Sequence, residues 1–177
     1  GRLDLSVANA LTNDVSILKG NGDGTFQAAT SFAAGSAPSS IIAADLDRDG
    51  KLDLAVANSG SNDVSILGGN GDGSFDPAIS YTAGFGPSSI SAGDFNEDGL
   101  VDLAVANASM NSISILAGIG DLGFALAVDY PCGSIPSALA TADFDRDGKL
   151  DLAIANNGSN SLTIIRNACP VPDLMVS

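Results

Sequence analysis

The sequence LDLAVAN at residues 52–58 decides the fold, because it returns at a fixed spacing along the chain. It is preceded by LDLSVAN at 3–9 and followed by VDLAVAN at 101–107 and LDLAIAN at 150–156, with a period of 49 residues. Such periodicity is the signature of a repeat architecture, in which each unit buries its apolar surface against its neighbours. The chain is therefore interpreted as one domain, residues 1–177, with repeats at approximately 1–35, 36–84, 85–133 and 134–177.

Each complete repeat contains four short runs of alternating apolar and polar residues, which is the pattern of half-buried β-strands. In the second repeat these runs cover residues 40–46, 52–58, 63–68 and 78–83, and turns rich in Asp, Asn and Gly separate them. No window shows a convincing helical stripe. A four-stranded unit of this length predicts an all-β fold made of β-propeller blades.

The chain is expected to contain about three and a half four-stranded blades, which is fewer than most propellers have. The first repeat begins at its second strand, and the fourth loses its pattern after Arg166. We therefore expect part of a larger ring, with an incomplete blade at each end. Two chains that pair to close a seven- or eight-bladed ring, as a homodimer, would cover the apolar faces left bare.

Eight of the nine aromatic residues lie at positions locked to the repeat, which predicts that they pack between neighbouring sheets. The equivalent sets are Phe26, Phe75 and Phe124; Phe32, Tyr81 and Tyr130; and Phe95 and Phe144, with Leu46 in the second repeat. Only Phe85 falls outside the pattern. Few aromatic rings are therefore left for a binding platform.

Three acidic segments share the pattern D-x-[DN]-x-D-G-x-x-D: DLDRDGKLD at 45–53, DFNEDGLVD at 94–102 and DFDRDGKLD at 143–151. Calcium takes about six to eight oxygen ligands from a tightly curled loop, in which Gly at position 6 makes the sharp turn. Side chains at positions 1, 3 and 5 point inward, position 7 offers its backbone carbonyl, and position 9 completes the shell. Three Ca²⁺ sites are predicted.

The predicted ligands of the first ion are Asp45, Asp47, Asp49, Lys51 and Asp53; those of the second are Asp94, Asn96, Asp98, Leu100 and Asp102; and those of the third are Asp143, Asp145, Asp147, Lys149 and Asp151. Asp4 is the closing residue of a fourth loop whose first half is absent.

An EF-hand is excluded for these loops, because it requires a Glu at position 12 and flanking helices. Position 12 is instead Val56, Val105 or Ile154, inside a run with the strand pattern. The alternative is an Asp/Gly turn that binds no ion. Three copies with three or four clustered carboxylates favour metal, because without a cation their mutual repulsion is costly.

The formal charge of −14 excludes nucleic acid as the expected partner, since phosphates would be repelled. No apolar stretch is long enough to span a bilayer, and residues 1–10 lack the pattern of a signal peptide. The chain has no histidine and no CxxC pair, which disfavours zinc. Its two cysteines, Cys132 and Cys169, are compatible with a disulfide or with two thiols.

The repeats resemble the FG-GAP family, also called VCBS repeats. The resemblance rests on the D-x-D-x-D-G-x-x-D loops, on the Gly-x-Phe turn, and on Gly-x-x-Pro-Ser at 35–39, 84–88 and 133–137, and it covers residues 1 to about 167. It implies the propeller of integrin α subunits and of many secreted bacterial proteins, with calcium bound between the first and second strands of a blade. The missing first loop, Asn96 and GIGDLG at 118–123 depart from the pattern.

The resemblance implies an extracellular or cell-surface module. The expected function is a calcium-stabilised scaffold for adhesion or protein interaction, with an unidentified protein ligand, and the alternative is a carbohydrate-binding, lectin-like propeller. An enzyme is not expected, because a nucleophile–base pair is hard to assemble without histidine and most clustered carboxylates belong to the metal loops.

Overall fold

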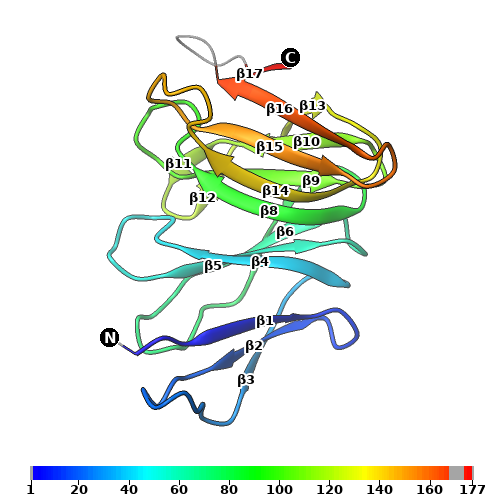
Figure 1. Cartoon of the computed structure of the whole chain (residues 1–177). Coiled ribbons are helices and arrows are strands. Elements are labelled where there is room, and N and C mark those ends of the chain that lie inside the picture. Colours follow the sequence, from blue (N-terminus) through cyan, green and yellow to red (C-terminus); the bar gives the residue numbers. More distant parts are fainter. Residues whose placement is uncertain (1, 168–173, 177) are drawn as a thin grey trace.

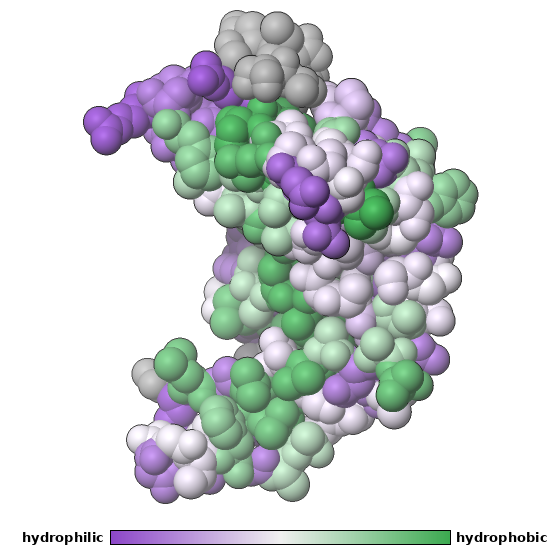
Figure 2. Space-filling model, turned by 45° about the vertical axis from the view of Figure 1, so that its right-hand side comes forward, coloured by the Kyte–Doolittle hydropathy of each residue, from purple (hydrophilic) through white to green (hydrophobic). Residues whose placement is uncertain are grey.

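The computed structural model describes residues 2–167 and 174–176, and throughout these the regular secondary structure is β-strand. Four antiparallel sheets are stacked in chain order, from β1–β3 at one end to β14–β17 at the other (Figure 1). The stack is an open arc hollowed on one side (Figure 2) and does not close into a ring. The all-β, blade-like architecture expected from the sequence is confirmed. Within the described ranges no helix is long and apolar enough to cross a membrane.

Each repeat contributes one sheet, in which the strands lie in sequential order. The first sheet has three strands, β1 (Leu5–Asn9), β2 (Asp14–Leu18) and β3 (Thr30–Ala33). The second sheet comprises β4 (Pro38–Ala44), β5 (Asp53–Asn58), β6 (Asp63–Leu67) and β7 (Ile79–Thr82). The third comprises β8 (Pro87–Gly93), β9 (Asp102–Asn107), β10 (Ser112–Leu116) and β13 (Val128–Pro131), and the fourth β14 (Pro136–Ala142), β15 (Asp151–Asn156), β16 (Ser161–Asn167) and β17 (Leu174–Val176).

The strand register is the same in every repeat, since the alternation of side chains fixes it. Ile41 lies opposite Val56 in the second sheet, and Ile90 lies opposite Val105 in the third. The strands β4, β8 and β14 each shift register just after their proline, as between Pro38 and Ser40. Proline has no N–H to donate to a ladder, so the strand tolerates it only at the end, beside this irregularity.

The core lies between successive sheets, because both faces of a middle sheet are covered by its neighbours. Leu54 and Val56 face back toward Val15 of the first repeat, whereas Ala55 and Ile66 pack forward in one cluster with Leu103 of the third repeat. A further cluster joins the third repeat to the fourth. This explains why β5 and β9 are buried along their whole length.

The aromatic residues pack across these interfaces, as expected from their spacing. Phe32 meets Phe75 of the next repeat edge-on with ring centroids 5.4 Å apart, and Tyr81 meets Phe124 in the same way at 5.4 Å. Such T-shaped pairs add about 0.5–1.5 kcal/mol to the burial of their area. Phe26, in the first repeat, is 44% exposed.

The first strands also hold neighbouring repeats together through side-chain hydrogen bonds. Ser39 Oγ donates to the carbonyl of Pro87 at 2.7 Å, and Ser88 Oγ donates to that of Pro136 at 2.7 Å. The Ser of the first two Gly-x-x-Pro-Ser segments therefore links two repeats, whereas Ser137 of the third donates to the carbonyl of Ala155 in its own repeat.

Two features differ from the sequence interpretation. The fourth sheet does not stop at its third strand, because β17 pairs with β16 and places Val176 opposite Ile165. The sequence did not predict β17, because its three residues are too few to show the alternation of apolar and polar side chains that marks a strand. In the third repeat, GIGDLG forms a small hairpin of β11 (Gly118–Gly120) and β12 (Gly123–Phe124), where the first and second repeats have a single bridge. Cys169 lies outside the described residues, and with it the question of a disulfide to Cys132.

Truncation of the buried Ile113 tests the inter-sheet core. Ile113→Ala removes a fully buried side chain from the cluster between the third and fourth repeats and should lower the free energy of unfolding by about 2–5 kcal/mol. Ile119→Ala, at a side chain that is 67% exposed, is the matched control and should change it by less than about 0.5 kcal/mol. Urea unfolding followed by circular dichroism measures both, and equal effects would contradict this packing.

Candidate metal centre

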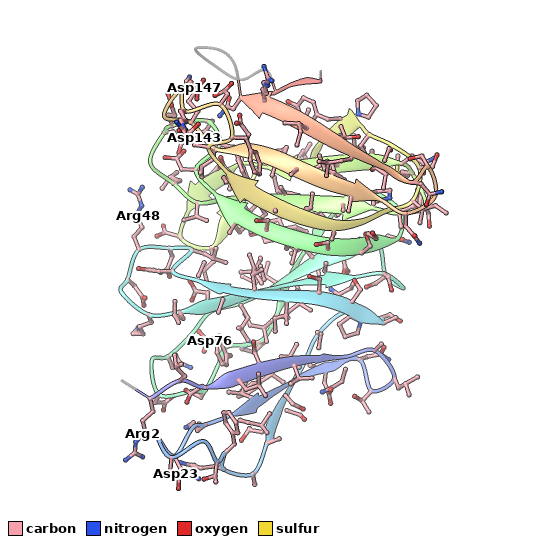
Figure 3. All side chains as sticks on the ribbon, in the orientation of Figure 1. Arg2, Asp23, Arg48, Asp76, Asp143 and Asp147 are labelled. Atoms are coloured by element: carbon pink, nitrogen blue, oxygen red, sulfur yellow. The ribbon has the colours of Figure 1, made fainter. Side chains whose placement is uncertain are left out.

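The three acidic loops connect the first and second strands of the second, third and fourth sheets. They leave β4, β8 and β14 and enter β5, β9 and β15. Arg48 of the first loop and Asp143 and Asp147 of the third lie on the same side of the stack (Figure 3). The sequence repeat therefore places its acidic segments along one face of the arc.

The curl of each loop depends on two residues in the left-handed backbone region. In the first loop these are Arg48, with φ of 67°, and Gly50, with φ of 86°. The equivalent residues are Glu97 and Gly99 at 59° and 84°, and Arg146 and Gly148 at 66° and 94°. Glycine adopts this conformation without steric cost, which accounts for the invariant position 6 in all three loops.

Backbone amides inside the loop hold the carboxylates in place. The Gly50 amide donates to Asp45 Oδ2 at 3.1 Å, and the Asp49 amide donates to Asp47 Oδ1 at 3.0 Å. The second loop repeats both contacts at 2.8 and 2.9 Å, with Asn96 as the acceptor at position 3. The loop is thus shaped by the same side chains that were predicted to bind the ion.

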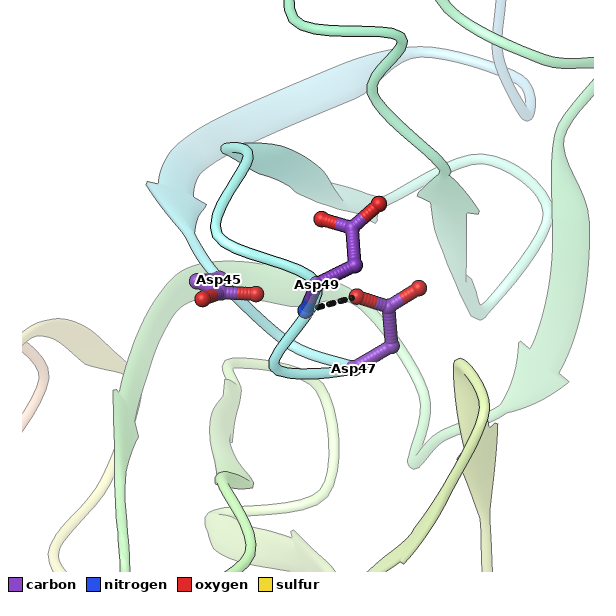
Figure 4. A group of neighbouring side chains, drawn as sticks. All are labelled: Asp45, Asp47 and Asp49. Atoms are coloured by element: carbon purple, nitrogen blue, oxygen red, sulfur yellow. Dashed lines mark hydrogen bonds between the residues drawn. The ribbon is translucent and has the colours of Figure 1, made fainter.

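The structure brings the carboxylates together in two of the three loops. Oxygen atoms of Asp45, Asp47 and Asp49 lie within 4.8 Å of one another (Figure 4). In the third loop the corresponding group consists of Asp143, Asp145 and Asp151. Asp53 and Asp147 stand outside these two groups, although both belong to the predicted ligand sets. The second loop has Asn96 in place of one carboxylate.

One carboxylate oxygen at position 1 has no hydrogen-bond partner in the first two loops. Asp45 Oδ1 and Asp94 Oδ1 are both buried and unpaired. A buried unpaired carboxylate oxygen is costly, whereas coordination by a hard cation would satisfy it. The donor set, made of oxygen atoms, therefore fits a calcium ion.

The aspartate at position 9 has a second task, which the sequence did not reveal. Asp53 is 1% exposed, and it accepts the amides of Leu46 and Gly69 at 2.8 Å each. Asp102 accepts those of Phe95 and Gly118 in the same way. These bonds tie the loop to the turn after the third strand. A carboxylate has about four acceptor sites, so a lone pair remains for a metal.

Asp151 repeats this arrangement with the amides of Phe144 and Asn167 at 2.9 Å each. The donors Gly69, Gly118 and Asn167 occupy equivalent positions. A repeated glycine in the sequence could have indicated this contact. It follows the third strand in the second and third repeats, and the first repeat has its equivalent at Gly20.

Burial raises the pKa of Asp53 and Asp102, and the two amide hydrogen bonds to each oppose this effect. Loop carboxylates, Asp47 and Asp49 in one case and Asp98 in the other, raise these pKa values further. A divalent cation in the loop would offset both the desolvation and the repulsion.

Position 7 differs among the loops. Lys51 Nζ lies 2.6 Å from Asp49 Oδ2, and this hydrogen bond lowers the pKa of Asp49. Lys149 Nζ lies 3.4 Å from Glu97 Oε2 of the preceding loop, and Leu100 carries no charge. The backbone carbonyl ligands predicted at these three positions stay predictions.

Substitution of Asp102 should destabilise the protein whether or not calcium is present. Asp102→Asn keeps the size of the side chain but sets an NH₂ group against a backbone amide, which should cost about 1–3 kcal/mol of unfolding free energy. Asp98→Asn, at an exposed loop position, is the control and should have little effect in chelator. Urea unfolding in EDTA compares the two variants. Equal stabilities there would contradict the role assigned to Asp102.

Comparison with known proteins agrees with this geometry. The FG-GAP-like repeat matches the chain at residues 1–56, 45–105 and 94–154. No curated protein matches the chain significantly.

Solved structures that share the fold include the following two. A lectin from Agrocybe aegerita that recognises non-reducing terminal N-acetylglucosamine is 18% identical, with a TM-score of 0.58 over 99% of this chain and 52% of its own. The V. cholerae biofilm matrix protein Bap1 is 21% identical, with a TM-score of 0.53 over 94% of this chain and 26% of its own. The chain thus spans about half of the first and a quarter of the second. On its sequence match, its repeat spacing and its blade-like sheets, the chain belongs to the FG-GAP-like repeat family.

Proposed function

We propose that the three loops bind Ca²⁺ and that the calcium-stabilised repeats form a scaffold for protein interaction outside the cell. The observation that carries the calcium proposal is the first loop, where three carboxylates converge and Asp45 Oδ1 is buried without a partner. The equivalent oxygen of Asp94 in the second loop is also buried without a hydrogen-bond partner.

The chemistry of the donors favours calcium over other metals. The loops offer carboxylate, amide and carbonyl oxygens, without the imidazole or thiolate ligands that zinc prefers. Bound calcium would supply positive charge at the centre of each loop. The chain itself orients the ligands, through the Gly turn at position 6 and the amides that hold Asp45 and Asp47.

Calcium should raise the stability of the folded chain. Binding to the native state alone adds about 2.7 kcal/mol per site at a hundredfold excess over Kd. Thermal unfolding in calcium and in EDTA measures this gain in stability, and an unchanged midpoint temperature would contradict the proposal.

Asp98→Ala should lower the number of ions bound from three to two in titration calorimetry, whereas Asp76→Ala, at an exposed acid outside the loops, should leave three.

The proposed role is binding rather than catalysis. The chain has no histidine, and among the described residues the groups of three acidic side chains that could hold a metal ion belong to the loops. The likeness to a biofilm matrix protein, together with the family, supports a location outside the cell. Tandem sheets leave their turns accessible, and these turns are the parts that a protein partner would meet.

Carbohydrate binding is the second candidate. It is favoured by a pocket between the first and second repeats, lined by Phe32, Phe75, Asp76 and Ser80 among others. An aromatic ring beside polar groups suits a sugar ring and its hydroxyls. The structural likeness to the lectin points the same way, and a glycan array separates this function from protein binding.

We further propose that two chains associate through the end faces of the arc. Leu5 is 44% exposed whereas its equivalent Leu54 is 2% exposed, because among the described residues no sheet lies on the outer face of the first sheet. At the other end Leu162 is 65% exposed whereas the equivalent Val64 is fully buried. The two end faces are therefore the two halves of the interface that recurs inside the chain, and pairing them head to tail twice would close a ring.

Light scattering in calcium buffer at micromolar concentration should report a dimer. Leu162→Asp places a charge on one end face and should shift the chain toward monomer, because an unpaired charge would be buried on pairing. Leu126→Asp, at a side chain that is 92% exposed in a loop, should leave the dimer intact. A stable monomer of the unsubstituted chain would exclude the closed dimer.

A further inference from the structure

A lysine lies inside the first metal loop and contacts one of the predicted calcium ligands. Lys51 Nζ donates to Asp49 Oδ2 at 2.6 Å, and the backbone amide of Lys51 donates to Asp49 Oδ1 at 2.8 Å. Both oxygens of this carboxylate are therefore engaged by a single residue. Asp49 is also one of the carboxylates that converge in this loop, together with Asp45 and Asp47. An ammonium group and a calcium ion would thus meet at the same ligand.

The ammonium group also interacts with other carboxylates of the loop. The hydrogen bond to Asp49 and the charge of that carboxylate raise the pKa of Lys51, and the charges of Asp47 and Asp53 raise it further. Lys51 is therefore protonated at neutral pH and balances part of the negative charge of the empty loop. A calcium ion in the same loop is repelled by this positive charge, and it competes with the ammonium group for the lone pairs of Asp49.

The turn that follows the third strand directs the lysine toward the loop. The aliphatic stem of Lys51 lies over Gly71, because a Cβ atom added to Gly71 would stand 3.0 Å from Lys51 Cδ. Gly71 has a φ of 79°, and its lack of a side chain leaves room for the stem. Arg2, the equivalent of Lys51 in the first repeat, lies over Gly22, where an added Cβ atom would stand 3.5 Å from Arg2 Cγ. The placement of the stem therefore has a cause in the backbone, independent of the ion pair.

The other two loops differ from the first at this position. In both, the backbone amide at position 7 again donates to the aspartate at position 5, at 2.7 and 2.9 Å. The side chains differ, because Leu100 carries no charge and Lys149 Nζ lies 3.4 Å from Glu97 Oε2 of the preceding loop. Lys51 thus pairs within its own loop, whereas Lys149 pairs with a neighbouring loop.

We propose that Lys51 is a competitor of calcium built into the first loop, which weakens calcium binding there and balances the charge of the loop when it is empty. The inference rests on the calcium binding proposed above. When an ion enters, the ammonium group leaves Asp49 and turns to solvent, to which 44% of the lysine side chain is already exposed. The backbone carbonyl of Lys51 stays at position 7, so the predicted ligand set remains complete. The first loop then fills at a higher calcium concentration than its four aspartates alone would require.

A calcium titration followed by NMR separates the three loops. In each loop the amide of the glycine at position 6 donates to the aspartate at position 1, so its signal reports that loop; these glycines are Gly50, Gly99 and Gly148. Lys51→Leu installs the residue type found at position 7 of the second loop. It should lower the Kd of the first loop about two- to fivefold, which is the range for a partly exposed ion pair. The Kd reported by Gly99 should change far less.

Lys19→Leu is the matched control, because it removes the same charge outside the loops. Lys19 lies over Gly73, in the same turn as Gly71, and its loss should leave the Kd of the first loop nearly unchanged. Salt provides a further control. In about 1 M KCl, where exposed charges are screened, Lys51→Leu and the unsubstituted chain should differ less in Kd. A merely structural role of Lys51 would not depend on salt in this way.

Stability without calcium is the second readout. In EDTA, Lys51→Leu should lower the midpoint temperature of unfolding by about 1–3 °C, because the carboxylates of the empty loop lose a balancing charge. In saturating calcium the midpoint should equal or exceed that of the unsubstituted chain. The sign of the change therefore depends on whether the loop is filled.

The inference is overturned if Lys51→Leu leaves the Kd reported by Gly50 unchanged or raises it, or if Lys19→Leu lowers this Kd as much. An unchanged midpoint in EDTA would also contradict it. Failure of the proposed calcium binding has a different signature, since none of the three glycine signals would then respond to calcium, and the role of Lys51 would fall with it.

Discussion

Burial of apolar side chains between successive sheets holds this protein together. One sheet of this protein cannot form a core alone, because its strands are short and both of its faces are apolar. β5 and β9 are buried throughout only because a sheet lies on each side of them. The stacking also sets the distance between repeats, so that Phe75 and Phe124 meet the aromatic residues of the preceding repeat edge-on.

The metal loops are attached to this core by a buried carboxylate. Asp53, Asp102 and Asp151 each accept two backbone amides, one from the loop and one from the turn or strand end that follows the third strand. The loop is therefore held at the end of the core before any ion arrives. Calcium binding would then act on ligands that are already oriented, which links the stability of the sheets to the proposed function of the loops.

The same interactions explain why the two ends of the arc differ from its middle. Leu5, Phe144 and Leu162 occupy positions that are buried in internal repeats, yet they are exposed here. The first repeat also keeps the acceptor at Ser16 and the carboxylate of Asp4 in the internal arrangement. Their geometry depends on contacts within the first repeat, from residues in or beside β1 and β2. The end repeats thus present pre-shaped surfaces.

The repeat, the strand alternation and the acidic loops follow directly from the amino-acid sequence, because each of these is a local pattern with a fixed period. The sequence therefore predicted the blade-like sheets, the packing of aromatic residues such as Phe32 and Phe75 between neighbouring sheets, and the approach of Asp45, Asp47 and Asp49. Tertiary structure alone decided that Asp53 ties its loop to Gly69, that β17 completes the fourth sheet, and which apolar residues stay exposed. These outcomes depend on which surfaces of neighbouring sheets pack against each other. In a periodic sequence, equivalent positions carry similar residues whether or not an adjacent sheet covers them.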